Sequence, residues 1–131
     1  MKKEEVENYL HQKIEKGETV SPILPGGIKN YLIDIDGTIC KEEGKVVGRT
    51  PYLDRIAKIN KLYDEGHTIV FYTARGLKSG RGEQHYRPIT EQQLKEWGVK
   101  YHELCFKGHD GDYFIDDRGI NAGDFFNETK V

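Results

Sequence analysis

The hydrophobic residues of this chain follow two kinds of spacing, one typical of helices and one typical of buried strands. Val6, Leu10 and Ile14 recur at intervals of one helical turn with charged residues between them, which predicts an amphipathic helix over residues 4–16 that Gly17 ends. Further along, short continuous apolar runs alternate with segments of helical periodicity. In chain order, these patterns predict strand 31–36, a small hairpin with arms 38–40 and 46–47, a helix from Pro51 to Gly66 with Thr50 as its N-cap, strand 68–73, loop 74–87, helix 88–97 ended by Gly98, and strands 101–106 and 113–116.

The alternation of strands and helices determines the expected fold class. Strands separated by helices are typical of parallel sheets covered by helices, so we predict an α/β protein with a three-layered, Rossmann-like parallel sheet. The chain of 131 residues shows no internal repeat or low-complexity tract, and its length suits one domain. Within that domain, residues 1–27 form an N-terminal amphipathic helix and loop, and residues 28–131 form the core.

The charges of the chain nearly cancel, with 20 Lys and Arg against 22 Asp and Glu. No overall field therefore favours nucleic acid or an anionic membrane. No apolar stretch approaches the ~20 residues that span a bilayer, and acidic residues lie at the N-terminus where a signal peptide needs an apolar run. We expect a soluble, cytoplasmic protein without a membrane partner, in which Cys40 and Cys105 are reduced structural thiols.

Polar residues follow every predicted strand. Asp34-Ile35-Asp36 ends the first strand and Thr73 the second, Lys107 comes just after the third, and Asp116-Asp117 ends the fourth. Ligands of parallel α/β sheets bind beyond the carboxyl ends of the strands, where these residues are expected to meet. A lone Thr at a strand end is usually structural and a lone Asp-Asp is usually a solvated turn, but the joint occurrence of these residues in this order favours one shared pocket.

The Asp34-Ile35-Asp36 segment is the strongest of these signals and has the layout of a phosphoryl-transfer site. Because alternate strand residues point to opposite faces, Asp34 and Asp36 are expected to share a face. Two carboxylates so close repel each other unless a cation or a proton joins them, which indicates Mg2+ or acid/base chemistry. Gly37 then allows a sharp turn at the strand end. Asp-x-Asp-Gly also begins many calcium loops, and a solvated acidic turn is the plainest alternative.

Four ordered motifs of the chain match a known family. They are Asp34-Ile-Asp-Gly-Thr38, Thr73 after an apolar strand, a following lysine, and Phe114-Ile-Asp-Asp117, over residues 31 to about 125. Together they resemble the haloacid dehalogenase superfamily of aspartyl-phosphate enzymes. Three further tracts look like small phosphatases associated with capsule or other surface-polysaccharide synthesis. These tracts are Ile69–Gly76, Gln93–His102 and Tyr113–Asn121.

This resemblance implies the chemistry of a phosphatase. Asp34 would attack phosphorus in line to form an aspartyl-phosphate, and Asp36 would protonate the leaving alcohol and then deprotonate the attacking water. Thr73 would hydrogen-bond a phosphate oxygen, and Lys107 would offset negative charge on the nucleophile and the transferring group. In relatives the lysine typically lies in a Gly-Lys-Pro stretch, whereas Lys107-Gly-His109 stands here, so a surface lysine is the alternative.

Mg2+ is the cofactor that the resemblance implies. Asp34, the backbone carbonyl of Asp36, and Asp116 would hold the ion within an octahedral shell of oxygen atoms. Asp117 would orient water at the metal.

The basic loop 75–87 is the expected specificity element. Loops positioned by a rigid sheet often carry binding groups, and the glycines of this loop suggest that it is mobile without ligand. A second anionic group of the substrate could be gripped by Arg75, Lys78, Arg81, His85 and Arg87, and a solvated basic loop is an equal alternative. The candidate substrate-binding residues are Gly37, Thr38, Ala74, Arg75, Lys78, Arg81 and Arg87.

The short intervals between the motifs leave no room for an inserted cap domain of the kind that encloses small substrates in many relatives. An open site suits large or terminal phosphates, or a site covered by another subunit of a homo-oligomer. We predict a Mg2+-dependent phosphomonoesterase that acts on a sugar phosphate or a similar polar metabolite. The alternatives are a nucleic-acid 3'-end phosphatase and a noncatalytic binding or scaffold protein that keeps the fold.

Overall fold

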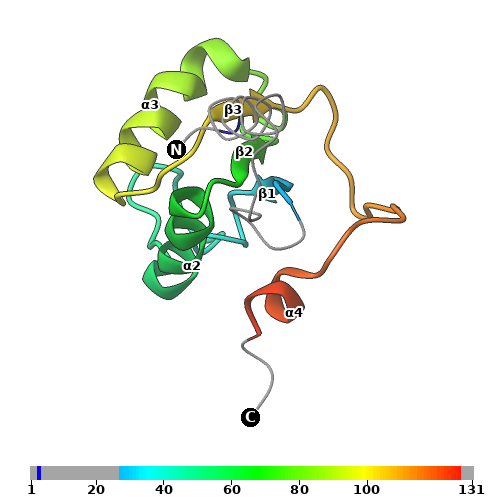
Figure 1. The fold of residues 1–131 in the computed structure, drawn as a ribbon. Helices are drawn as coiled ribbons and strands as arrows, with labels where there is room; N and C mark the ends of the chain where they lie inside the picture. Colours follow the sequence, from blue (N-terminus) through cyan, green and yellow to red (C-terminus); the bar gives the residue numbers. More distant parts are fainter. Residues whose placement is uncertain (1–2, 4–26, 128–131) are drawn as a thin grey trace, which may run out of the picture.

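Three parallel strands form the centre of the structure. The computed structural model describes residue 3 and residues 27–127. The predicted N-terminal helix over residues 4–16 lies outside these residues, as does the loop after it up to residue 26. The elements in chain order are β1 (Asn30–Asp34), α2 (Leu53–Asp64), β2 (Thr68–Thr73), α3 (Gly82–Glu96), β3 (Glu103–Phe106) and α4 (Ala122–Phe126), and the strands pair in the order β1-β2-β3 (Figure 1).

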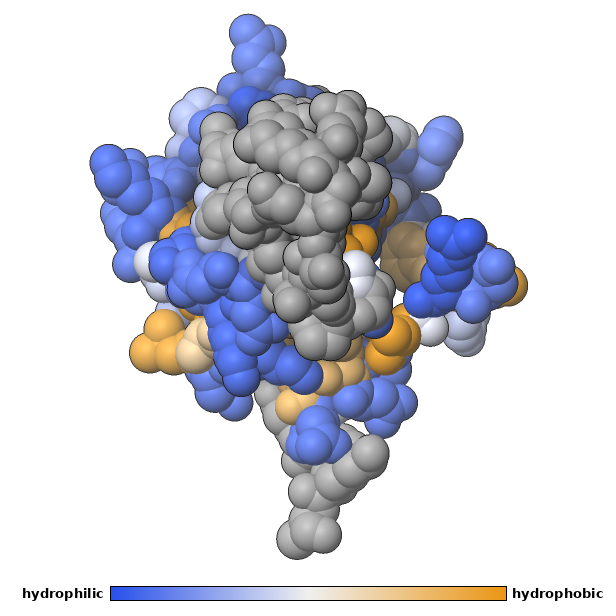
Figure 2. Space-filling model, in the orientation of Figure 1, coloured by the Kyte–Doolittle hydropathy of each residue, from blue (hydrophilic) through white to orange (hydrophobic). Residues whose placement is uncertain are grey.

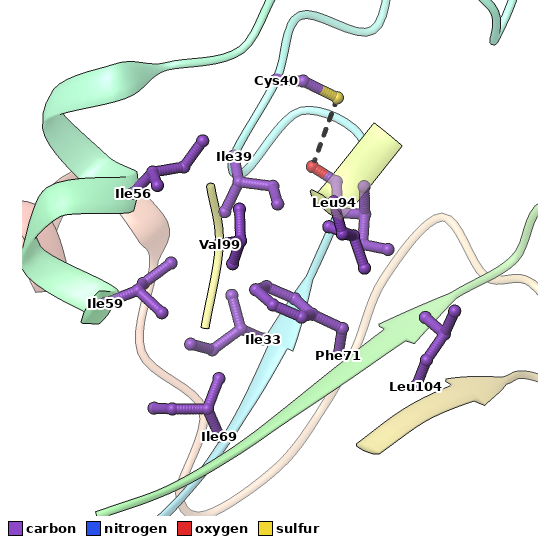
Figure 3. Close-up of a cluster of buried hydrophobic side chains, with 11 residues drawn as sticks. Ile33, Ile39, Cys40, Ile56, Ile59, Ile69, Phe71, Leu94, Val99 and Leu104 are labelled. Carbon is purple, nitrogen blue, oxygen red and sulfur yellow. Dashed lines mark hydrogen bonds between the residues drawn. The ribbon is translucent and has the colours of Figure 1, made fainter. Parts of the chain in front are cut away.

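One face of the sheet packs against both long helices. Ile33 of β1 pairs with Phe71 of β2, and Phe71 pairs with Leu104 of β3. These three residues are buried together with Ile56 of α2 and Leu94 of α3, as Figure 3 shows. Both crossovers therefore lie on the same face, which right-handed connections between successive neighbouring strands require.

No helix of the described residues covers the opposite face. Leu32 of β1 is 63% exposed there, because alternate strand residues point away from the helices. The short helix α4 lies against α2 instead, where Lys58 donates a hydrogen bond to the carbonyl of Phe125. The predicted α/β class with a parallel sheet is confirmed, whereas the described residues show two of the three predicted layers.

Glycines end both crossover helices where the sequence predicts it. Gly66 and Gly98 have φ angles of 101° and 70°, a backbone region that only glycine enters at low cost. The start of α2 is different from the prediction. Pro51 pairs with Cys40 in an isolated antiparallel bridge, so the helix begins two positions later with Tyr52 as its N-cap.

The same bridge corrects the predicted hairpin. Its arms are not residues 38–40 and 46–47, because Lys41 donates to the carbonyl of Thr50 at 2.9 Å and Tyr52 donates to that of Ile39 at 2.7 Å. Residues 41–50 thus form a loop that leaves the site and returns to it.

Helix α3 begins earlier than the predicted residue 88. The helix contains Pro88 and starts at Gly82, so the loop after β2 is shorter than expected. Proline lacks the N–H that a helix interior uses, which makes it a common start signal. Here ion pairs of Arg87 with Glu83 and Glu91, each one turn away, span the proline.

The predicted fourth strand, residues 113–116, is wrong. The chain leaves the sheet after β3 and runs to α4 as an irregular arm (Figure 1), and Ile115 is 98% exposed. Asp116 accepts the backbone N–H of Arg118 at 2.8 Å. Such a local turn competes with strand pairing. In the described residues, β1 therefore has β2 as its only strand partner.

Apolar side chains on the side of the molecule shown in Figure 2 form small separate patches within a mostly hydrophilic described surface. Among the described residues, no helix has the length and apolar content needed to cross a membrane.

Candidate active site

The sheet brings the first three predicted motifs to one edge. Asp34 is the last residue of β1 and pairs with Tyr72, one residue before Thr73. The backbone N–H of Lys107 donates to the carbonyl of Thr73 at 2.8 Å, which extends the pairing of β2 and β3. Because the three strands are parallel, their carboxyl ends place these side chains together.

Asp34 and Lys107 form the centre of this edge. Lys107 Nζ lies 3.6 Å from Asp34 Oδ1, and its side chain is 10% exposed while that of Asp34 is 44% exposed. The ammonium group also lies over the rings of Tyr72 and Phe114, at 4.9 and 4.4 Å from their centroids. The alternative of a surface lysine is therefore wrong, because Lys107 is held beside the predicted nucleophile.

Burial raises the pKa of Asp34 above its usual value, and the charge of Lys107 offsets this only in part. Asp34 nevertheless lies beside the ammonium group of Lys107 and is partly exposed to solvent. A carboxylate in this position has an exposed oxygen with which to attack an incoming group.

A tight turn carries the chain from Asp34 to the second carboxylate. Gly37 has a φ angle of 83° and donates its N–H to the carbonyl of Cys40 at 2.9 Å. The thiol of Cys40 lies 3.4 Å from Asp36 Oδ1 and 3.8 Å from the carbonyl of Ile35. Burial and the neighbouring Asp36 raise the pKa of the Cys40 thiol to about 12, so it stays a thiol, as the sequence predicts. Thr38 is half-buried in this turn.

Two arginines hold the carboxylate of Asp36. Arg75 makes a bidentate pair with it at 3.0 and 2.9 Å, and Arg49 Nη1 lies 2.8 Å from Asp36 Oδ1. Burial raises the pKa of Asp36, but the hydrogen bonds and charges of Arg75 and Arg49 outweigh it and leave the pKa below its usual value. Asp36 is therefore an ionised group at neutral pH.

Arg75 is a structural residue rather than a substrate-gripping one. Its side chain is 1% exposed. Besides Asp36, the guanidinium donates to Thr90 at 3.0 Å and to Gln93 at 2.7 Å, both on α3. The prediction that it reaches the substrate from a basic loop does not fit this placement.

Thr73 ends β2, and Ala74 connects it to Arg75. The hydroxyl oxygen of Thr73 is buried and accepts the N–H of Arg75 at 3.1 Å. Its hydrogen stays available for a phosphate oxygen. Ala74 is half-buried and its carbonyl accepts the N–H of Leu77 at 3.2 Å.

The other predicted binding cations lie apart from this cluster. Lys78 and Arg81 are exposed, and Arg87 pairs with Glu83 at 2.8 Å and caps the carbonyl of Leu104 at 2.8 Å. The loop is also more constrained than its glycines suggest. A Cβ on Gly76 would come within 2.8 Å of the backbone of the first α3 residue.

Asp116 and Asp117 do not join the site. Both are exposed and lie on the arm that leaves the sheet. Within residues 27–127, no group of three or more His, Cys, Asp or Glu side chains could hold a metal ion. Asp36 faces two arginines and Asp34 faces a lysine, so the donors as they are placed do not fit Mg2+, which needs several uncommitted oxygen atoms.

Sequence reasoning missed Arg49 altogether. The residue lies in the loop between the predicted hairpin and the helix, and no spacing rule connects such a position with Asp36. Its proximity to Gly48 and to a Thr-Pro helix signal was the only indication that the chain turns back there.

Comparison with known proteins supports the fold. No protein-family model and no curated protein matches the chain. A crystal structure of a target protein from Vibrio cholerae is similar to this one, with a TM-score of 0.65 and 29% sequence identity over 76% of this chain and 88% of that chain. The name of that protein specifies no activity, so the function has to be argued from the site.

Proposed function

We propose that the protein is a phosphomonoesterase in which Asp34 is the nucleophile. The observation that carries the proposal is the pair of Asp34 and Lys107, 3.6 Å apart at the carboxyl edge of a parallel sheet. An oxygen of Asp34 forms a bond to phosphorus while the bond to the ester oxygen breaks, and the leaving oxygen takes its proton from water. Water then attacks phosphorus, which releases inorganic phosphate and restores the carboxylate.

Lys107 supports this step by its charge. Negative charge spreads over the phosphoryl oxygens in the transition state, and a cation fixed beside the nucleophile stabilises that charge without having to reorient. Its two aromatic neighbours and its low exposure keep the ammonium group in place.

Asp36 serves the second step better than the first. Since its pKa is lowered by Arg75 and Arg49 against the effect of burial, it is ready to accept a proton from water rather than to donate one to an alcohol. An aryl phosphate, whose phenolate leaves without help from an acid, should therefore be hydrolysed faster than an alkyl phosphate.

The motif resemblance implies Mg2+, which would supply charge compensation for the phosphoryl oxygens, but the aspartates as they are placed do not fit the ion, and no step of the proposal depends on it. Asp34, the carbonyl of Asp36, Asp116 and Asp117 would have to approach one another for the ion to bind.

We propose a phosphorylated sugar or a similar polar metabolite as the substrate, within surface-polysaccharide synthesis as the resemblance suggests. Asp34 is nearly half exposed, and the described residues contain no domain over the edge. A small, hydrophilic phosphoester fits such an open position.

Hydrolysis of p-nitrophenyl phosphate, with and without Mg2+, tests the function. We expect wild-type activity and a loss of at least about a thousandfold in kcat for Asp34→Asn, because the nucleophile is removed. Activity that survives the substitution contradicts the assignment. A panel of sugar phosphates and 3'-phosphorylated oligonucleotides then separates the metabolite phosphatase from the nucleic-acid phosphatase.

A further inference from the structure

Two arginines contact Asp36, and only one of them, Arg75, has a hydrogen-bond partner on each of its three side-chain nitrogens. Arg75 makes two hydrogen bonds to Asp36 and one each to Thr90 and Gln93. Arg49 has an ion pair to Asp36 through Nη1 and a hydrogen bond from Nη2 to the carbonyl of Gly44 at 3.2 Å. Its Nε is buried and has no hydrogen-bond partner within the described residues.

An unfilled donor in this position needs an explanation. Buried polar groups are almost always paired, since an unpaired one loses its hydration without compensation. The Arg49 side chain is only 14% exposed. A guanidinium with a buried free N–H beside an ionised carboxylate is short of an acceptor, and the acceptor groups that pair best with it are carboxylate and phosphate oxygens.

The charges around the two aspartates place Arg49 where it can change partners. Lys107 faces Asp34, while Arg49 and Arg75 both face Asp36. A third carboxylate lies nearby, because a Cβ on Gly37 would be 3.4 Å from Glu42 Oε2. A phosphate group at Asp34 would therefore need a cation released from its carboxylate. Arg49 lies on the mostly exposed segment 41–50, whereas Arg75 is committed to α3.

We propose that Arg49 is a substrate-binding residue that donates hydrogen bonds to the phosphoryl oxygens of the phosphoester attacked by Asp34. The proposal rests on the proposed function for the identity of the ligand. Arg75 is the internal contrast, because it contacts the same carboxylate but is committed to α3. In this proposal, Arg49 pairs with Asp36 when no ligand is bound, and it pairs with the phosphate when the substrate is bound.

Affinity for phosphate tests this role separately from catalysis. Inorganic phosphate is titrated into the full-length protein by calorimetry, and the KM and kcat for p-nitrophenyl phosphate are measured alongside. For Arg49→Ala we expect phosphate affinity to fall about tenfold or more and KM to rise with it, as the loss of a charge-assisted hydrogen bond predicts. Arg49→Lys should recover part of the affinity, because it keeps the charge and loses the planar fork.

Lys45→Ala is the matched control. Lys45 is exposed on the same loop, so this variant removes one positive charge at a similar place in the chain and should change phosphate affinity less than twofold. Equal losses in both variants would show a general field effect and overturn the assignment.

The other possible results separate the role of Arg49 from the proposed function. If the wild type hydrolyses phosphoesters and Arg49→Ala keeps wild-type phosphate affinity, Arg49 is only a tether of the loop and the inference fails while the function stands. If the wild type binds phosphate through Arg49 but hydrolyses no phosphoester, the function fails and the anion site stands. If Arg49→Ala does not fold, unchanged phosphate affinity in Arg49→Lys and Arg49→Gln overturns the inference.

Discussion

Two of the aspartate pairs in this chain, Asp34 with Asp36 and Asp116 with Asp117, lie in opposite environments. Asp34 and Asp36 follow a paired strand, and each is held against a cation at 3.6 Å or less. Asp116 and Asp117 follow an apolar run of similar composition, but they lie exposed on an arm outside the sheet. The comparison shows that pairing of the preceding strand, rather than the acidic motif itself, determines whether the carboxylates reach a site.

The electrostatic states of the two pairs differ for the same reason. Burial raises the pKa of Asp34, and the arginines lower that of Asp36 despite burial. The pKa of Asp116 is also lowered, but its causes are the local N–H of Arg118 and the side chain of Asp117. The first pair is controlled by residues distant in sequence, and the second only by its neighbours.

The largest effect that would sharpen this comparison comes from Lys107→Met. We expect kcat for p-nitrophenyl phosphate to fall about a hundredfold or more, because the fixed cation beside Asp34 is lost. The fold should persist, since the backbone N–H of Lys107 keeps its bond to Thr73. Lys45→Met, on an exposed position, is the control. A loss below threefold would show that Lys107 has no role in the chemistry.

A second variant, Asp116→Asn, asks whether the two acidic pairs ever act together. If Mg2+ binds through Asp116, its apparent affinity in the activity assay should fall at least about tenfold, and high Mg2+ should restore part of the activity. Unchanged Mg2+ dependence would mean that the exposed arm stays apart from the site during catalysis.

Much of the sheet and of its edge is predictable from the sequence. The apolar runs of β1 and β2 and the glycines after both crossover helices are local signals, and the meeting of Asp34, Thr73 and Lys107 follows once three strands are parallel. The contacts of Arg49 and Arg75 are not predictable in this way. They join residues 13 and 39 positions from Asp36 through loops whose paths depend on packing against α3. The arm was mispredicted because an apolar run of strand type does not ensure a pairing edge.

Substitutions in the buried Arg75 cluster should lower the free energy of unfolding more than substitutions on the exposed arm. Arg75→Met leaves Asp36, Thr90 and Gln93 without their shared donor, so we expect the free energy of unfolding to fall by about 3 kcal/mol. Ile115→Ala, on the exposed arm, should change it by less than about 0.5 kcal/mol. Urea denaturation measures both, with Arg81→Met as an exposed control for the lost charge. Comparable losses at the two sites would show that the arm is packed in solution.

The smallest expected effect is a pH dependence of stability that comes from Asp36. Because its folded pKa is lowered, its contribution is present above the unfolded value of about 3.9 and is lost as the pH falls through the folded value. The stability difference between the wild type and Asp36→Asn should therefore be largest near pH 7 and shrink towards about pH 3. A difference that stays constant over this range would show that the arginines do not hold the carboxylate in its ionised form.

The central claim is that Asp34 carries the phosphoryl group during turnover. Acid-quenched mixtures of the protein with p-nitrophenyl phosphate, digested and analysed by mass spectrometry, test it directly. We predict a phosphorylated peptide with the group on Asp34, in a higher fraction for Asp36→Asn because hydrolysis of the intermediate slows, and none for Asp34→Asn. Turnover with phosphate on another residue, or with no covalent phosphate in either protein, would contradict the account.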